Sequence, residues 1–198
     1  MPTHCGTLGR RSLGGMLLLP LLRAPSRAET PLDIPALMAR LAAVPERRAT
    51  FREEKRIAAL TDPLLSTGTL LYQRPGRLEK LTTWPEQESL VVDGDRVVLT
   101  AGNDPPRVLP LGADPGLRAL VDAFRAPLAG DLAALTRSFR VQGGGSPAAW
   151  QLDLTPINPA VARFLRGVRV TGAGAELRAI AVTQANGDEQ NLTIEARP

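Results

Sequence analysis

Histidine and cysteine are almost absent from this chain of 198 residues. The one histidine and the one cysteine, His4 and Cys5, both stand close to the N-terminus. Without an imidazole or a thiol further along, the rest of the chain can form no Ser-His-Asp or Cys-His nucleophile, no histidine or cysteine zinc site and no disulfide. We therefore expect no metal and no cofactor, and no catalytic residues stand out.

An excess of charge is also lacking once the first 28 residues are set apart. The net charge of +4 equals the four arginines of that segment, which contains no acidic residue. The remainder carries 20 basic and 20 acidic residues, spread along the chain rather than clustered. Nucleic-acid binding needs a concentrated basic face, so we expect no nucleic-acid partner.

The N-terminal segment has no apolar run long enough to cross a bilayer. The run Leu13–Leu22 has about ten residues, against the roughly 20 that a spanning helix requires. Paired arginines precede it, and Ser26 and Ala28 supply the small residues of a cleavage site. These features predict a signal peptide over residues 1–28, cleaved near Ala28, and one mature exported domain over residues 29–198. The arginine pair suits either general secretory or twin-arginine export.

Apolar spacing divides the mature chain into a few helices and many short strands. Apolar residues recur at three- and four-residue steps over 32–44 and over 114–135, which predicts two amphipathic helices. Asp114 caps the second, and Pro127 and Gly130 divide it. Short segments bounded by prolines and glycines predict about nine antiparallel strands. The expected fold class is α+β, with helices on one side of an antiparallel sheet.

Several shorter motifs have a local interpretation. Asp93–Gly94 and Asn186–Gly187 predict tight hairpins, and Gly143–Gly145 predicts another turn. Glu53 and Glu54 are adjacent in a strand, where neighbouring side chains face opposite ways. They cannot act as a catalytic carboxylate pair, and we expect them on a solvated strand face.

Aromatic residues are few, and we expect each of them to pack in the core. The mature chain has seven: Phe51, Tyr72, Trp84, Phe124, Phe139, Trp150 and Phe164. A curved sheet with an apolar face and two covering helices holds either a filled core or a pocket for an apolar ligand. The residues alone leave both alternatives open.

Several motifs, taken in order, carry a family resemblance. They are the N-terminal amphipathic helix, Ala49–Glu53, Gly68–Pro75, Leu90–Gly94 with its following hairpin, and the mid-chain helical block. From about Leu32 to Ile194 the chain resembles the LolA-like family of periplasmic lipoprotein carriers, in particular a divergent LolA-related branch. It departs from the better-known carriers in lacking their tryptophan after Arg-Pro, with Leu78 in that region.

The resemblance implies an incomplete antiparallel β-barrel closed by helices, with an apolar cavity for acyl chains. It also implies that Arg74, in the Arg-Pro segment, holds the helical lid closed. We expect these residues to line the cavity: Leu37, Leu41, Phe51, Leu70, Tyr72, Leu90, Val92, Leu120 and Phe124.

The function expected from the resemblance is that of a periplasmic carrier or chaperone that catalyses no reaction and acts as a monomer. It would shield acyl chains of lipoproteins or other acylated lipids between an inner-membrane donor and an outer-membrane acceptor. One alternative is a non-catalytic lipid-sensing or scaffold partner of an envelope complex on the same fold. Another is a hydrolase that uses carboxylates.

Overall fold

The computed structural model describes residues 32–196, so the predicted signal peptide and its cleavage site lie outside the described residues. The α-helices in this range are α1 (Ile34–Ala42), α2 (Pro115–Ala129), α3 (Leu132–Ser138) and α4 (Pro159–Ala162), and η1 (Leu111–Ala113) is a 3₁₀ helix. The strands are β1 (Glu46–Arg56), β2 (Leu64–Gln73), β3 (Arg77–Trp84), β4 (Glu88–Asp93), β5 (Arg96–Ala101), β6 (Arg107–Pro110), β7 (Phe139–Ser146), β8 (Ala149–Pro156), β9 (Leu165–Ala173), β10 (Glu176–Gln184) and β11 (Glu189–Ala196).

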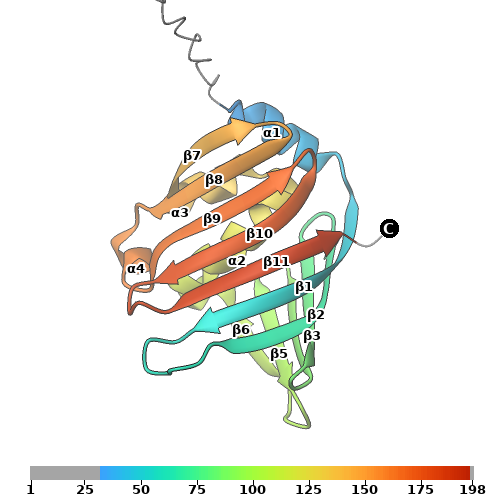
Figure 1. Ribbon diagram of the computed structural model, residues 1–198, viewed down its shortest axis with the longest axis vertical. Helices are drawn as coiled ribbons and strands as arrows, with labels where there is room; N and C mark the ends of the chain where they lie inside the picture. Colours follow the sequence, from blue (N-terminus) through green and yellow to red (C-terminus); the bar gives the residue numbers. More distant parts are fainter. Residues whose placement is uncertain (1–31, 197–198) are drawn as a thin grey trace, which may run out of the picture.

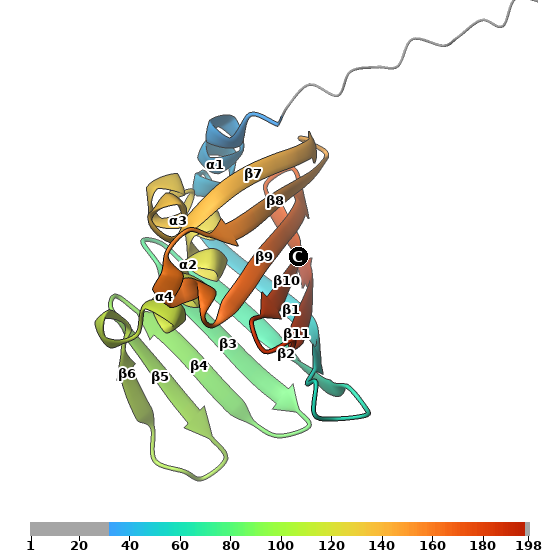
Figure 2. The same ribbon diagram turned by 90° about the vertical axis from the view of Figure 1, so that its left-hand side faces the viewer.

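All eleven strands form one antiparallel sheet in the order β6-β5-β4-β3-β2-β1-β11-β10-β9-β8-β7. β1 pairs with β2 on one side and with β11 on the other, which joins the two halves of the chain. The sheet curves but does not close, because β6 and β7 are its two free edges (Figures 1 and 2). α2 and α3 lie inside the curve, and α1 lies at one end. The predicted α+β fold, an incomplete antiparallel barrel covered by helices, is confirmed.

Local capping signals place the helices. The carboxylate of Asp33 accepts a hydrogen bond from the amide of Ala36 at 3.0 Å, and Asp114 caps α2 in the same way. Gly130, with φ of 68°, ends α2 in the left-handed conformation that favours glycine. Pro127 lies inside α2, so only Gly130 divides the helical block.

Two sequence-based expectations about the sheet are wrong in detail. Gly143–Gly145 belong to β7, and the turn follows at residues 147–148. A Cβ at Gly143 would stand 2.9 Å from Cγ1 of Ile34, so glycine here allows α1 to lie close to the strand. The short strand β6 was not among the expected strands; it ends in Pro110 and lies at the edge of the sheet, which tolerates proline.

Apolar side chains inside the curve form two clusters. The larger packs α1, α2 and α3 against β1 and β7 to β11. The smaller packs Tyr72, Val92 and their neighbours against α2. Phe124 and Leu128 of α2 contact both clusters. Two aromatic residues do not join either core as expected, since Trp84 and Phe164 are each 54% exposed. No helix among residues 32–196 is long and apolar enough to cross a membrane.

Candidate functional site

A cavity of about 310 Å³ lies between α2 and the inner face of the sheet. Its apolar wall is formed by side chains from five strands and from α2: Ala49, Leu70, Leu78, Leu177, Ile180, Leu192, Ile194, Phe124 and Leu128. The exposed side chains of Glu46, Arg48 and Glu176 border one side. The cavity is therefore apolar inside and opens to solvent beside charged residues, which suits one end of an amphiphile.

The structure brings three of the nine predicted cavity residues to this wall. Leu70, Tyr72 and Phe124 line the cavity. The other six lie in the packed interior around it. Leu37, Leu41, Phe51 and Leu120 belong to the larger cluster, and Leu90 and Val92 belong to the smaller one. The cavity thus occupies the place where the two clusters meet along α2.

Arg47, near the start of β1, connects α1, α2 and the β9–β10 turn to the sheet through hydrogen bonds. Its Nη2 donates to the carbonyl oxygens of Leu41 at 2.6 Å and Ala175 at 3.2 Å. Its Nη1 donates to the carbonyl oxygens of Val44 and Leu128, each at 3.2 Å. These carbonyls belong to α1, the segment after it, α2 and the β9–β10 turn. A planar guanidinium with five donors can bridge this many acceptors from one point.

The surroundings of Arg47 are largely apolar. Its guanidinium carbon lies 6.0 Å from the centroid of the Tyr72 ring, which is the partner position on β2. Burial lowers the pKa of Arg47 below its ordinary value, while Tyr72 and Glu176 act in the opposite direction. An arginine stays protonated in proteins, so a fixed positive charge stands at the wall of the cavity.

Arg74, the residue that the resemblance links to the lid, lies at the end of β2. Its Nη1 donates to the carbonyl oxygen of Ala42, the last residue of α1, at 2.8 Å. The side chain is exposed. It makes one contact with α1, whereas Arg47 contacts α1, α2 and a turn, so a lid role for Arg74 stays a prediction.

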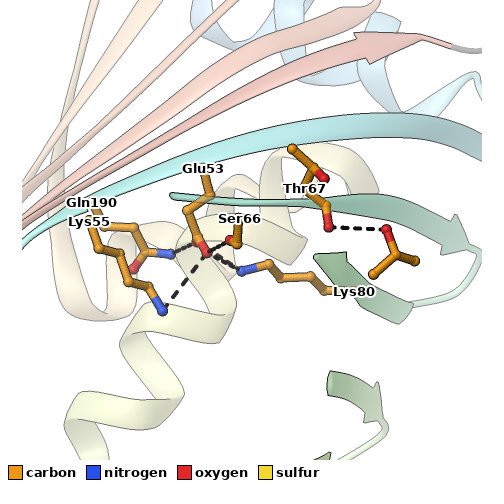
Figure 3. Close-up of polar contacts among 7 residues, drawn as sticks. Glu53, Lys55, Ser66, Thr67, Lys80 and Gln190 are labelled. Carbon is orange, nitrogen blue, oxygen red and sulfur yellow. Dashed lines mark hydrogen bonds and ion pairs between the residues drawn. The ribbon is translucent and has the colours of Figure 1, made fainter. Parts of the chain in front are cut away.

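A buried polar cluster lies further along the inner face of β1 (Figure 3). Glu53 is 2% exposed, contrary to the expected solvated position. Lys80 Nζ donates to both of its carboxylate oxygens at 2.7 and 2.8 Å, and Ser66 donates at 2.9 Å. Gln190 of β11 donates as well. Burying the charge of Glu53 costs little free energy, because donors from β2, β3 and β11 form hydrogen bonds with its carboxylate.

This cluster stabilises the sheet and offers no catalytic pair. Burial raises the pKa of Glu53, but the charges of Lys80 and Lys55 and the hydrogen bonds of Lys80 and Ser66 outweigh burial, so the net pKa is lowered. Glu54 faces the other way and pairs with Arg56 at 2.6 Å. Among residues 32–196, no three acidic, histidine or cysteine side chains are placed to hold a metal ion.

Sequence reasoning did not single out Arg47, and it expected Glu53 on a solvated face. A signal for them exists in the alternation of β1, where Ala49 and Phe51 face inward and the residues between them face outward. The same alternation places Arg47 and Glu53 inward, as charged residues on an otherwise apolar face. An inward-pointing charge in a strand predicts a specific partner.

A comparison with known protein families identifies the family of the chain. Residues 25–196 match the family described as outer membrane lipoprotein carrier protein, LolA-like, and the chain therefore belongs to that family. The resemblance drawn from the sequence motifs is confirmed. A comparison with curated proteins finds no match.

Several solved structures are similar to the chain at low sequence identity. A LolA superfamily protein from Nitrosomonas europaea is 12% identical over 84% of this chain and 94% of its own, with a TM-score of 0.43. The lipoprotein LppX of Mycobacterium tuberculosis is 14% identical over 83% and 95%, with a TM-score of 0.42. The Pseudomonas aeruginosa MucA/MucB complex matches at 11% identity over 82% of this chain and 56% of that one, with a TM-score of 0.42.

Proposed function

We propose that this protein is a periplasmic carrier that shields the acyl chains of lipoproteins or other acylated lipids. It would receive them from an inner-membrane donor and pass them to an outer-membrane acceptor. The observation that supports this function is the apolar cavity beneath α2, in a chain that belongs to a family described as lipoprotein carriers. The cluster around Glu53 is fully partnered, so it offers no competing reactive site.

An acyl chain in transit needs such a cover because water opposes its exposure. A 16-carbon chain exposes roughly 15 methylenes at about 0.8 kcal/mol each, on the order of 12 kcal/mol in total. The cavity of about 310 Å³ is near the lower end of the roughly 300–1,000 Å³ usual for ligand pockets. We infer that α2 moves outward when a long chain enters.

We assign the closure of this cover to Arg47 and Arg74. Arg47 holds α1 and α2 to the start of β1, and Arg74 holds the end of α1 to the end of β2. In both bonds to α1 the acceptor is a backbone carbonyl of the helix. α1 can therefore move away from the sheet without any rearrangement of its own side chains. Opening breaks these bonds and exposes the apolar wall, and closing restores both.

Mass spectrometry of the protein purified from a periplasmic extract tests this function. A carrier should retain acylated cargo in a stoichiometric amount, and an apolar fluorescent probe should bind the emptied protein and be displaced by fatty acids. Absence of both cargo and probe binding would refute the carrier function and favour the scaffold alternative.

Ala49→Leu gives a second test, because Ala49 lines the cavity and a larger side chain there occupies the space of the chain. The larger side chain takes up volume that the probe would fill, and a loss of about 1–3 kcal/mol in binding free energy corresponds to a fall in probe affinity of about 5- to 150-fold. Ala181→Leu is the matched control, since Ala181 alternates with the buried Ile180 and Val182 and faces the other side of the sheet. Equal affinity in the two variants would place the probe outside the cavity.

A further inference from the structure

Six of the eight large apolar side chains exposed in residues 32–196 lie at one rim of the sheet. Hairpin turns alternate between the two rims of an antiparallel sheet. The rim away from α1 carries the β1–β2, β3–β4, β5–β6, β8–β9 and β10–β11 connections, and we call it the distal rim. Its exposed large apolar residues are Leu60, Leu64, Leu65, Trp84, Ile157 and Phe164. The opposite rim, with α1 and the charged border of the cavity, has none among the described residues.

Hydrogen bonds hold three of the distal connections together. The amide of Ala58 in the β1–β2 loop donates to Oδ1 of Asp188 in the β10–β11 turn at 2.9 Å. The amide of Ala185 in that turn donates to the carbonyl oxygen of Phe164, just after α4, at 2.9 Å. Figure 1 shows α4, the β10–β11 turn and the β1–β2 loop along one side of the molecule. These connections therefore form one connected surface.

The exposed side chains on this surface stand on turns and strand ends. Leu60 lies in the β1–β2 loop, and Leu64 and Leu65 begin β2. Trp84 is the last residue of β3 and pairs with Thr67 of β2. Apolar residues gathered on one exposed surface mark an interaction site. Separate apolar tips can enter a fluid layer, whereas a folded partner would need a hollow for each of them.

Arginines beside Phe164 give this surface a second chemical feature. Arg163 and Arg166 flank Phe164, are exposed, and form no ion pair with any described residue. The chain has no acidic residue between Asp153 and Glu176. A guanidinium group binds phosphate through paired N–H donors. A phospholipid surface places phosphates directly above an apolar layer, which matches arginines beside an exposed phenylalanine.

Elsewhere on the distal rim, acidic and basic residues roughly balance. Lys55 and Arg56 end β1, Asp62 lies in the following loop, and Glu189 begins β11 opposite Arg56. The attraction to phosphate is therefore local to α4, and the burial of apolar side chains supplies the rest of the affinity. Tryptophan suits such a boundary, because its ring is apolar and its N–H is polar.

We propose that the distal rim binds the surface of a phospholipid bilayer. Leu60, Leu64, Leu65 and Trp84 enter the apolar layer, and the arginines beside Phe164 contact lipid phosphates. This goes beyond the proposed carrier function, because the protein itself touches the membrane without a donor or an acceptor protein. The charged border of the cavity lies at the opposite rim, so it stays accessible while the protein is bound.

Sedimentation with lipid vesicles tests the inference. The protein should bind vesicles of phosphatidylcholine, and bind more tightly when phosphatidylglycerol is included. Leu60→Ser, Leu64→Ser and Leu65→Ser should each weaken binding about 5-fold, and together on the order of 100-fold. Leu81→Ser and Val108→Ser are the matched controls, since these exposed residues lie within strands and not at the rim, and binding should not change.

The two tryptophans supply an independent readout. Trp84 is 54% exposed, whereas Trp150 is 2% exposed. The emission of Trp84 should shift to shorter wavelength with vesicles and be quenched by lipids that carry bromine in their acyl chains. Trp84→Phe should abolish this response. Arg163→Gln with Arg166→Gln should remove the preference for phosphatidylglycerol.

Two results would overturn the inference. If the unaltered protein binds neither kind of vesicle, a protein partner is left for the distal rim. If the rim variants and the controls lose binding equally, the rim is not the contact surface. All these variants should unfold at the same denaturant concentration as the unaltered protein, because the substituted side chains are exposed.

The carrier function and this inference can fail independently. Rim variants should bind an apolar probe as the unaltered protein does, because the cavity wall is unchanged. Ala49→Leu, which fills the cavity, should bind vesicles normally. A loss of vesicle binding in Ala49→Leu would place the lipid contact in the cavity and overturn the inference.

Discussion

Replacing Arg47 by leucine should loosen the helical cover of the cavity. The guanidinium donates to the carbonyls of Leu41 in α1 and Leu128 in α2, and opening of the cover breaks both bonds. A hydrogen bond made by a charged group contributes about 1.5–3 kcal/mol. Two of them stabilise the closed state by at least about 3 kcal/mol, so their loss should shift the population toward the open state on the order of 100-fold.

Hydrogen exchange measured residue by residue is the appropriate assay. Protection of the amides in α1 and α2 should fall on the order of 100-fold, while the amides of β8 to β10 should keep their protection. The release rate of a bound apolar probe should rise in parallel. Arg52→Leu is the matched control, since Arg52 is exposed on the same strand. Arg47→Lys keeps the charge without the planar fork, and we expect an intermediate result.

Two results would refute this reasoning. Helix protection within about threefold of the unaltered protein would show that these bonds do not govern opening, since less than about 1 kcal/mol would then separate the states. An equal loss of protection in helices and sheet would show that Arg47 stabilises the whole fold and not the closed cover.

The remaining predictions concern Arg74 and Glu53. Arg74→Leu removes one exposed bond to α1, so cargo release should change by no more than about tenfold; a larger effect than that of Arg47→Leu in the same assay would assign the lid to Arg74. Glu53→Gln leaves Lys80 buried without its counter-ion and should lower the free energy of unfolding at neutral pH by about 3 kcal/mol. The double variant Glu53→Leu with Lys80→Met removes both charges and should recover most of this loss. The folded-state pKa of Glu53 is lowered, so the stabilisation that its carboxylate provides is present above about pH 4.3 and is lost as the pH falls through the folded-state pKa. Glu53→Gln lacks this stabilisation at every pH. Its free energy of unfolding, measured with a denaturant across this range, should therefore decline less steeply toward acid.

Local chemistry in the sequence was enough to predict most elements of the fold, although not β6 or the full length of β7. Asp33 and Asp114 cap the helices, Gly130 ends α2, and alternation marks the strands. These signals act between residues that are close along the chain, so the sequence displays them directly. The scarcity of histidine and cysteine likewise limited the chemistry available, and the order of the motifs identified the family.

The cavity wall required the tertiary structure. Leu90 and Val92, which were expected to line the cavity, pack into the smaller cluster. Ile180 and Ile194, which no cavity prediction included, line the wall. A strand pattern shows which face is buried and not which element covers it, and a cavity is the volume that the covering helix leaves unfilled.

The polar groups that control the site also depended on the tertiary structure. Arg47 meets Leu128, 81 residues away, and Glu53 meets Gln190, 137 residues away. The hydroxyl of Tyr72 has no hydrogen-bond partner among the residues that the structure describes, which only their arrangement in space decides. The sequence determined that these side chains face inward, by the period of the strand. Their partners, or the lack of one, were decided by how β1 joins the two halves of the sheet beneath α2.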